Sequence, residues 1–556
     1  MADRIWKSLG GLDEENQASR KSIIQTDFLD TEKEGSVCIN YRLSGYWEAD
    51  TPYDQEEVTL LDIPQAGFVT EVGAPMLVRE GLFVAIPDNA EFLSVDAEII
   101  ERTELQEKYD ILPVPQEALE TEELNFNRND AIYESGEVYP PQIVEYVQTT
   151  EICGARCIHL FVYPFQYRPL IKQLTALTEL KITVHFTYEH QETDNHIGSI
   201  GNTFYNSQLL GYQPERENTD SSKKPRMVII TTEELAYALR ILEGVKTFLY
   251  DVEIVYLENI RQQYPEVDNV EAIHSYLMDE HQKTPISYAI LGGGIDKIPS
   301  KRIYDSQLRK EIANDNYYCS ASDRSKPLPL FALGRLPVST IQEMHSLADY
   351  AAYYNRFFND TRKKAVFTAY DDDSRGYKKC KQDIISTLDK EFSITECYEG
   401  SCSKAELIDA INKGVGFVNY RGHGSYTAWS SKNGLSTKDI SKLNVERNTP
   451  NVFSIACNNC AIHQSSCLGV EWMRQLKAIS FLGASAPSYT TVNHVFDKYL
   501  WEGIHQQKLT KAGDIFVWAT LELYRNRSDK YAVTNILEYL LLGDPTADYM
   551  EDKTER

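Results

Sequence analysis

The hydrophobic pattern of this chain changes at Met227, and the change separates two regions of different fold class. Before it, short apolar runs alternate with clusters of Pro, Gly, Asn and Asp, which is typical of an antiparallel β-sandwich. After it, apolar strands alternate with amphipathic helices, which predicts a mostly parallel sheet covered by helices. A chain of 556 residues is also too long for one ordinary core. We therefore expect a multidomain protein, all-β at the N-terminus and α/β at the C-terminus.

The pattern divides the chain into four segments. Residues 1–35 are polar and are expected to be a lead-in, and residues 36–188 should form the β-sandwich. Residues 189–226 are polar without an apolar period, which indicates an inter-domain linker. Residues 227–556 should form the α/β domain. Within the β region, the acidic stretch 116–129 is expected to be a solvated loop.

Charge and the N-terminal sequence restrict the partners and the location. The formal net charge is −27, which argues against nucleic acid as the main partner, because phosphate binding needs a basic face. The first residues lack the apolar core of a signal peptide, and no apolar run is long enough to span a bilayer. We therefore expect no membrane partner and a cytoplasmic protein, or a secreted one if a leader has been removed. Most of the ten cysteines should be reduced thiols. The oligomeric state is unknown from sequence.

Two predicted strands of the second region end in residues that can react. One is followed by Arg421-Gly-His-Gly424 and the other by Cys457. Ligands bind outside the carboxyl ends of strands in an open α/β sheet, so His423 and Cys457 should share one functional edge. A thiol needs a nearby base to ionise at neutral pH, and imidazole titrates in the right range. The pattern predicts Cys457 as a nucleophile, His423 as its base, and the Gly424 N–H as an oxyanion donor.

Other interpretations fit the same residues. Cys460, His463 and Cys467 follow Cys457, and such a cluster could form a zinc or CxxC redox site. A zinc site usually pairs two cysteine knuckles and only one is present, so we expect no metal there. His423 and Cys457 could each be a buried residue without chemistry, since free cysteine is among the most buried residue types.

The motifs around these residues resemble the gingipain family of cysteine peptidases, relatives of the caspases. The resemblance rests on FVNYRGHGSYTAW, FSIACNNC and GVEWM, and it extends from about Met227 to Asp548. Residues 36–188 resemble the β-rich propeptide of the same family. The resemblance implies a caspase-like fold and a cysteine endopeptidase that hydrolyses peptide bonds through a thioester acyl-enzyme. It also implies a protein or peptide substrate and synthesis as a latent zymogen.

The resemblance also assigns roles to single residues. Cys457 matches the nucleophile and His423 the base, and Gly424 would help to form the oxyanion hole. Asp315 and Asp323 fall where the family keeps acidic residues, so one could orient His423 and the other could line the S1 pocket. A carboxylate in that pocket would favour Arg or Lys at P1, the residue before the cleaved bond. No organic cofactor is needed. Members of the family bind calcium, so calcium could be a ligand here, although the sequence offers no dedicated loop for it.

A rival hypothesis belongs to another functional class. The α/β region could be a catalytically degenerate caspase-like scaffold whose β domain binds a protein partner. The sequence departs from the family pattern at Gly294 and Cys460, which puts local loop geometry in question. The intact pair of Cys457 and His423 argues against this scaffold hypothesis.

Overall fold

The computed structural model describes residues 4–9, 22–30, 34–53, 56–120, 122–152, 155–188, 209–211, 224–321, 327–354, 361–372, 374–445, 448–464 and 466–550. The chain forms two compact units. The first comprises Met1–Gln116, Leu124–Glu217 and Glu522–Asp529, and the second comprises Glu117–Glu123, Asn218–Leu521 and Lys530–Arg556.

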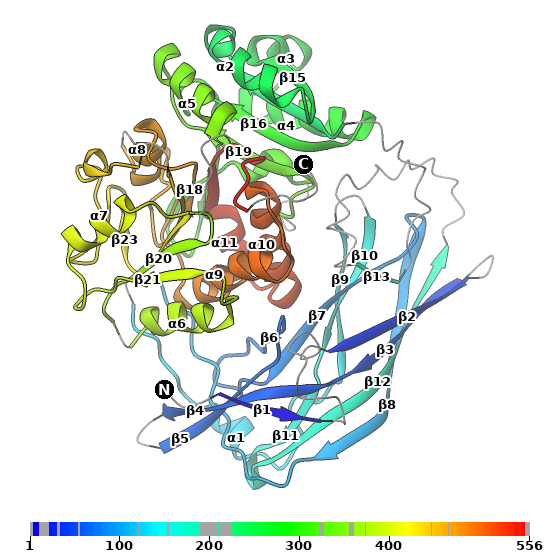
Figure 1. Ribbon diagram of the computed structural model, residues 1–556. Helices are drawn as coiled ribbons and strands as arrows, with labels where there is room; N and C mark the ends of the chain where they lie inside the picture. Colours follow the sequence, from blue (N-terminus) through cyan, green and yellow to red (C-terminus); the bar gives the residue numbers. More distant parts are fainter. Residues whose placement is uncertain are drawn as a thin grey trace. The chain divides into compact units, whose positions relative to one another are not determined.

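The first unit is built almost entirely from strands (Figure 1). One sheet has the order β1-β4-β5, a second has the order β13-β7-β10-β9 with β6 on β7, and a third has the order β11-β12-β3-β2 with β8 on β12. Within these sheets all pairs are antiparallel except β13 with β7. The elements are β1 (Ile5–Ser8), β2 (Ile23–Asp30), β3 (Glu34–Arg42), β4 (Gly45–Tyr53), β5 (Glu56–Asp62), β6 (Gly67–Phe68), β7 (Val78–Ala85), β8 (Ala90–Glu104), α1 (Asp130–Tyr133), β9 (Val144–Ile152), β10 (Ala155–Val162), β11 (Phe165–Arg168), η2 (Pro169–Ile171), β12 (Gln173–Tyr188) and β13 (Leu209–Gly211).

Alternating burial along the strands explains the core of this unit. Successive side chains of a strand point to opposite faces, so an apolar residue at every second position builds one buried face. On β3 and β12 the facing pairs on that side are Val37–Val184, Ile39–Ile182 and Tyr41–Leu180, all fully buried. They belong to one apolar core shared by strands of different sheets. The predicted β-rich N-terminal region is therefore confirmed.

Two segments contain strands that the sequence pattern did not predict. The lead-in 1–35 contains β1, which pairs with β4, and β2, which pairs with β3. The linker 189–226 contains β13, which pairs with β7. These runs are too short or too polar to show a period, and they gain their backbone hydrogen bonds only from partner strands.

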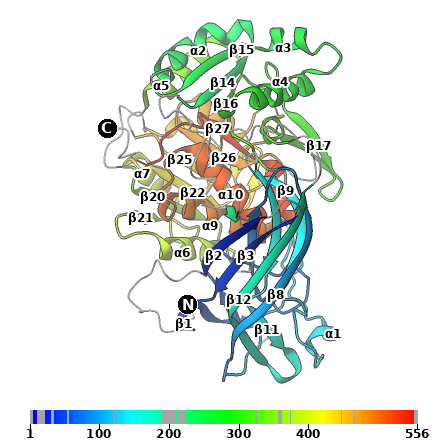
Figure 2. The same ribbon diagram turned by 90° about the vertical axis from the view of Figure 1, so that its right-hand side faces the viewer.

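The second unit is organised on a ten-stranded sheet with the order β15-β14-β16-β19-β27-β26-β25-β22-β20-β21 (Figure 2). All neighbours are parallel except β26 and β27. The strands of the unit are β14 (Arg226–Thr231), β15 (Asp251–Tyr256), β16 (Ile286–Gly292), β17 (Lys301–Asp305), β18 (Lys310–Asn314), β19 (Ala332–Leu336), β20 (Lys364–Ala369), β21 (Ser393–Glu396), β22 (Phe417–Arg421), β23 (Gly424–Ser425), β24 (Ala428–Trp429), β25 (Asn451–Ile455), β26 (Ser480–Ala484) and β27 (Tyr539–Gly543).

Amphipathic helices connect these strands, as the alternating pattern predicts. The central strands β16, β19, β22, β25, β26 and β27 are buried at every position, as expected of a sheet covered on both faces. In the described part of the chain, no helix has the length and apolarity needed to cross a membrane. The helices are α2 (Glu233–Lys246), α3 (Leu257–Gln263), α4 (Asn269–Lys283), η4 (Asn316–Cys319), α5 (Ile341–Tyr353), α6 (Tyr377–Thr387), α7 (Lys404–Asn412), η6 (Ile440–Lys442), α8 (Leu468–Arg474), α9 (Thr490–His505), α10 (Ala512–Asn526) and α11 (Lys530–Glu538).

Candidate active site

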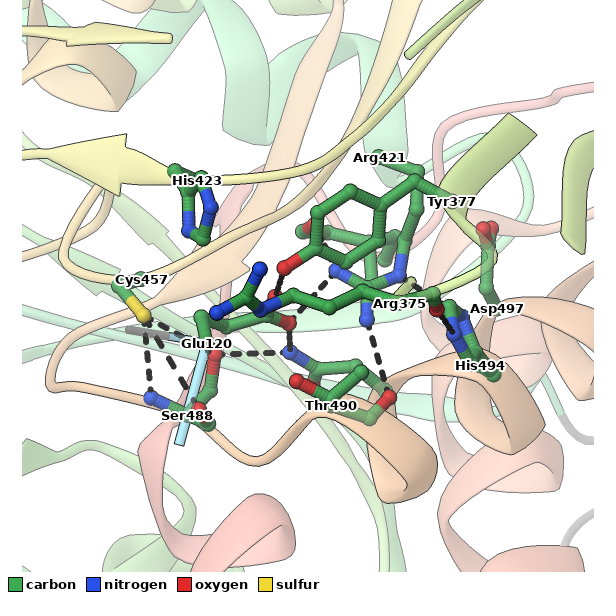
Figure 3. Close-up of polar contacts among 12 residues, drawn as sticks. Glu120, Arg375, Tyr377, Arg421, His423, Cys457, Ser488, Thr490, His494 and Asp497 are labelled. Carbon is green, nitrogen blue, oxygen red and sulfur yellow. Dashed lines mark hydrogen bonds and ion pairs between the residues drawn. The ribbon is translucent and has the colours of Figure 1, made fainter. Parts of the chain in front are cut away.

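Two adjacent parallel strands place His423 and Cys457 at one edge of the sheet. In the β22–β25 ladder, Arg421 is the register partner of Ile455. His423 and Cys457 each come two residues after this pair, so both follow their strands at the same level. Figure 3 shows both side chains where the strands end. The structure therefore brings together the two residues that the strand-end pattern singled out.

Glycines let the loop after β22 approach the nucleophile closely. Gly422 has a φ of +150°, a backbone conformation that other residues rarely adopt. A Cβ atom on residue 424 would overlap the carbonyl oxygen of Cys457. The carbonyl of His423 accepts hydrogen bonds from Ser430 N (2.9 Å) and Tyr420 Oη (2.8 Å), which fix the loop. The backbone at Gly424 is thus held against that of Cys457, as an oxyanion site formed by both would require.

The His423 imidazole is partly buried and held by aromatic rings. Its ring makes edge contacts with Tyr370 and Tyr377, at centroid distances of 4.7 and 5.5 Å. Within the described residues its Nδ1 has no hydrogen-bond partner. Burial lowers the pKa of His423, and the negative charge of Glu120 opposes this only in part. At neutral pH the imidazole is therefore uncharged and can accept a proton.

The Cys457 thiol is buried, and the hydrogen bonds described for it all involve one residue, Ser488. Ser488 N donates to Cys457 Sγ at 3.3 Å, and Ser488 Oγ lies 3.6 Å from the same sulfur. Burial raises the pKa of Cys457 to about 12, the nearby Glu120 carboxylate adds to the increase, and the bonds from Ser488 offset part of it. The described side chains show no hydrogen bond between Cys457 and His423. In this state the sulfur is a neutral thiol rather than a thiolate.

A short segment of the second unit, Glu117–Glu123, pairs with the backbone beside this thiol. Glu120 N donates to Ser488 O at 3.1 Å, and Thr490 N donates to Ala118 O at 3.0 Å. Leu119 and Tyr489 form the antiparallel bridge between these two bonds. The residue that contacts Cys457 Sγ, Ser488, is thus the residue that binds the backbone of Glu120. We call Glu117–Glu123 the docked segment.

The carboxylate of Glu120 is bound by three side chains. It accepts hydrogen bonds from Arg421 Nη1 at 2.6 Å, from Asn493 Nδ2 at 2.7 Å and from the Tyr377 hydroxyl. The side chains of Glu120 and Arg421 are both fully buried. Burial by itself lowers the pKa of Arg421, but the Glu120 carboxylate and neighbouring acidic groups such as Tyr377 together raise the net value, so the guanidinium stays charged. We call Arg421, Tyr377 and Asn493 the carboxylate site, and Figure 3 labels Arg421 and Tyr377 beside Glu120.

The predicted role of Asp315 does not fit the structure. Its two carboxylate oxygens accept from Nε and Nη2 of Arg335 at 2.6 and 2.8 Å, and both side chains are buried. A buried guanidinium needs such a bidentate partner, so Asp315 is committed to this pair. It neither bonds to His423 nor joins the carboxylate site among the described contacts. Asp323, the second candidate, lies outside the described residues.

The cysteines near the nucleophile are packing residues. Cys460 and Cys467 are buried, and burial raises the pKa of both thiols, that of Cys467 to about 12. In the described ranges, His, Cys, Asp and Glu side chains form no group of three that could hold a metal ion. Elsewhere, Cys397 and Cys402 form a disulfide, and the seven other described cysteines are free, in agreement with the expectation of mostly reduced thiols.

Comparison with known proteins agrees with the division of the chain into a β-rich N-terminal region and an α/β C-terminal region. The profile "Peptidase family C25" matches residues 220–550, and the profile of the C25 propeptide matches residues 23–218. Gingipain R2 of Porphyromonas gingivalis is 22% identical over 520 residues, which cover 87% of this chain and 67% of that protein. Lys-gingipain of the same species is 22% identical over 506 residues, covering 83% of this chain and 28% of that protein.

Solved structures show the same fold. The Arg-specific cysteine proteinase gingipain R superposes with a TM-score of 0.51 at 19% identity, covering 61% of this chain and 80% of that one. A complex of gingipain pro- and mature domains from P. gingivalis superposes with a TM-score of 0.50 at 19% identity, covering 58% of this chain and 79% of that one. Several curated relatives are longer proteins, of which this chain spans between a fifth and two thirds.

Proposed function

Because the chain belongs to peptidase family C25, and is a cysteine endopeptidase made as a zymogen with the family's propeptide, we propose that Cys457 and His423 carry out its reaction. The observation that supports this most directly is the register of β22 and β25, which sets both residues at the same distance beyond one strand pair. A nucleophile and a base held on rigid neighbouring strands have the arrangement that acyl transfer needs.

The reaction follows from these groups. His423 takes the proton of the Cys457 thiol as the sulfur attacks the carbonyl carbon of the substrate peptide bond. The N–H groups of Gly424 and Cys457 stabilise the oxyanion of the tetrahedral intermediate. The intermediate collapses to a thioester as His423 returns the proton to the leaving amine. Water then attacks the thioester while His423 accepts its proton. The C–S bond breaks, the acid product is released, and the Cys457 thiolate takes the proton back from His423.

The docked segment accounts for latency. It lies within the residues matched by the propeptide profile, and its backbone is hydrogen-bonded to the backbone of Ser488 and Thr490 beside the nucleophile. A substrate strand needs those same backbone groups, so substrate and segment exclude each other. The neutral thiol of the docked state is consistent with an enzyme that waits for release of the segment.

Specificity does not transfer directly from the relatives. The names of the relatives describe Arg- and Lys-directed enzymes, and Arg or Lys at P1 stays the prediction that the family resemblance makes. That prediction requires a carboxylate in S1. Asp315 is paired with Arg335, and the charged group nearest the docked Glu120 side chain is a cation, Arg421. The P1 preference of this chain therefore depends on its own residues around Glu120.

We propose an exported protein, because the Cys397–Cys402 disulfide is of the kind that persists in oxidising compartments. Counting free thiols in protein taken directly from its source, with alkylation before lysis, tests this. Calcium stays a prediction from the family resemblance. The described His, Cys, Asp and Glu side chains do not form a group that fits a metal ion, and no step above uses one.

A comparison of four full-length chains tests the catalytic assignment. Cleavage of a mixed peptide library is measured for the parent chain and for Cys457→Ala, His423→Ala and Cys460→Ala, each also carrying Glu120→Gln to weaken docking. We expect no cleavage from Cys457→Ala, a loss of about 10²-fold or more from His423→Ala, and turnover close to the parent from Cys460→Ala. Cleavage by Cys457→Ala at the parent rate would refute the assignment.

A further inference from the structure

The docked segment lies in the active site as an extended substrate would, and its buried glutamate has a defined position relative to the nucleophile. Extended peptides are recognised by adding a strand to an exposed backbone, so that alternate side chains enter pockets. Glu120 N bonds to Ser488 O and Ala118 O accepts from Thr490 N, which are alternate positions of one antiparallel ladder. Because Ser488 also contacts Cys457 Sγ, Glu120 is the segment residue set beside the thiol. Figure 3 shows its side chain extending from there toward Tyr377 and Arg421.

We propose that Arg421, Tyr377 and Asn493 form an S1 site that selects an acidic P1 residue, glutamate above all, and that Glu120 occupies it as a P1 side chain would. This inference rests on the proposed peptidase function. It names a substrate class, peptides with a carboxylate side chain before the cleaved bond, that differs from the basic residues for which the relatives are named.

The carboxylate site offers hydrogen-bond donors to its ligand. Arg421 can only donate. Asn493 also presents its NH₂ group, because its Oδ1 already accepts from Asn535 Nδ2 at 2.9 Å and from Tyr539 Oη at 2.8 Å. A carboxylate, which only accepts, satisfies these groups. A P1 lysine or arginine, which only donates, would find no anion among these three side chains, could donate only to the neutral Tyr377 hydroxyl, and would meet a buried cation.

Arg421 is fixed in place by other contacts and cannot easily withdraw. Its Nη2 donates to Thr490 O at 2.9 Å, its Nη1 also donates to Ile455 O at 3.2 Å, and its Nε donates to His494 Nδ1 at 3.1 Å. The guanidinium also lies over the Tyr377 ring, 4.5 Å from its centroid. Since Arg421 precedes Gly422 and His423 directly, the same strand end holds the specificity residue and the catalytic base.

A second buried carboxyl, that of Glu538, also acts on the pKa of Cys457, but it does not supply the anion that a basic P1 side chain would need. Burial raises the pKa of Glu538 well above its ordinary value, so this group is uncharged at neutral pH. A neutral carboxyl cannot compensate the charge of a P1 cation placed beside Arg421.

The length of the docked Glu120 side chain leads to a second expectation. Aspartate is one methylene shorter than Glu120, so it should bind the same site less well.

Covalent probes measure this preference on the full-length chain. Acyloxymethyl ketones of the form Ala-Leu-X, with X as Glu, Asp, Gln, Arg or Lys, copy residues 118–119 of the docked segment. Attack by the thiol displaces the carboxylate leaving group and leaves a thioether on Cys457, which peptide mass spectrometry locates. Docking lowers the available fraction of the site equally for all probes, so the ratios of labelling rates are independent of latency.

We expect the Glu probe to label Cys457 at least tenfold faster than the Gln, Arg and Lys probes. Arg421→Gln should abolish the Glu-over-Gln preference. Tyr377→Phe, which keeps the ring under Arg421 and serves if Arg421→Gln does not fold, should reduce it several-fold. Glu123→Gln, an exposed change in the docked segment, should leave it unchanged.

The outcomes separate the two proposals. Fastest labelling of Cys457 by the Arg or Lys probe would overturn the acidic S1 site and leave the peptidase assignment intact. A Glu preference that survives unchanged in both Arg421→Gln and Tyr377→Phe would also overturn it. Failure of every probe to label Cys457, in the parent chain and in Glu120→Ala, would refute the peptidase function and the S1 site together.

Discussion

Replacing Glu120 by glutamine should release the docked segment. The change keeps the size of the side chain but removes the anion that pairs with Arg421 at 2.6 Å, where both side chains are fully buried. Removing one partner of a buried ion pair costs about 3–5 kcal/mol, because the remaining charge is left uncompensated. The undocked state escapes this cost, since water can then reach Arg421. The change therefore acts on docking more than on folding.

The expected magnitude follows from that range. A difference of about 1.4 kcal/mol corresponds to a factor of ten in an equilibrium constant, so the open fraction should rise by roughly a hundredfold or more. Alkylation of Cys457 by iodoacetamide reports this fraction, because the thiol reacts only when it is uncovered. The rate is followed by peptide mass spectrometry, with the partly exposed Cys38 of the first unit as an internal standard.

Glu123→Gln is the matched control, because it makes the same chemical change at an exposed position of the same segment. It should leave the rate at Cys457 within about twofold of the parent chain, since an exposed charge contributes little. A folded Glu120→Gln chain whose Cys457 reacts no faster than that of Glu123→Gln would show that the ion pair does not hold the segment, and the reasoning would fail.

Three further predictions concern the loop, the buried ion pair and the thiol. Gly424→Ala should lower kcat by about 10²-fold or more, because its Cβ overlaps the Cys457 carbonyl and displaces an oxyanion donor; kcat within tenfold of the parent would contradict the described loop. Asp315→Asn should lower the free energy of unfolding in urea by about 3–5 kcal/mol and leave the ratio of Glu to Arg probe rates unchanged, whereas a changed ratio would place Asp315 in S1. Burial raises the pKa of Cys457 to about 12, and the Glu120 carboxylate of the docked segment adds to the increase, so docking should be strongest below the ordinary cysteine pKa of about 8.5 and weaken as pH rises above it. The alkylation rate of the parent chain should then climb steadily with pH, and a plateau near pH 9 would contradict the raised value.

The sequence predicted that Cys457 and His423 lie at one edge of the sheet because its signal is local. Each residue directly follows an apolar run, and parallel strands bring such ends to one edge. The two fold classes were visible for the same reason, since the period of the apolar residues changes at Met227. The short strands β1, β2 and β13 were missed because their pairing partners, rather than their own composition, determine their structure.

The carboxylate site was missed because its two charges are 301 residues apart in the chain. Residues 116–129 were expected to be a solvated acidic loop, yet Glu120 is fully buried. One signal was available, since Arg421 ends a mostly apolar strand, in which Asn419 is the other polar residue, and a buried arginine requires an anion. The sequence did not identify that anion. Likewise it marked Asp315 as an acidic residue near the site but gave no sign that the fork of Arg335 binds it.

Cys457 is the residue assigned to carry the acyl group, and trapping the acyl-enzyme tests that assignment directly. The full-length Glu120→Gln chain is mixed with an activated Ala-Leu-Glu ester, quenched in acid within the first turnover and digested for mass spectrometry. We predict the added mass of the acyl group on the peptide that contains Cys457, and none on any peptide of the Cys457→Ala chain. Acylation of Cys460, Cys467 or another residue, at a rate that matches turnover, would contradict the account.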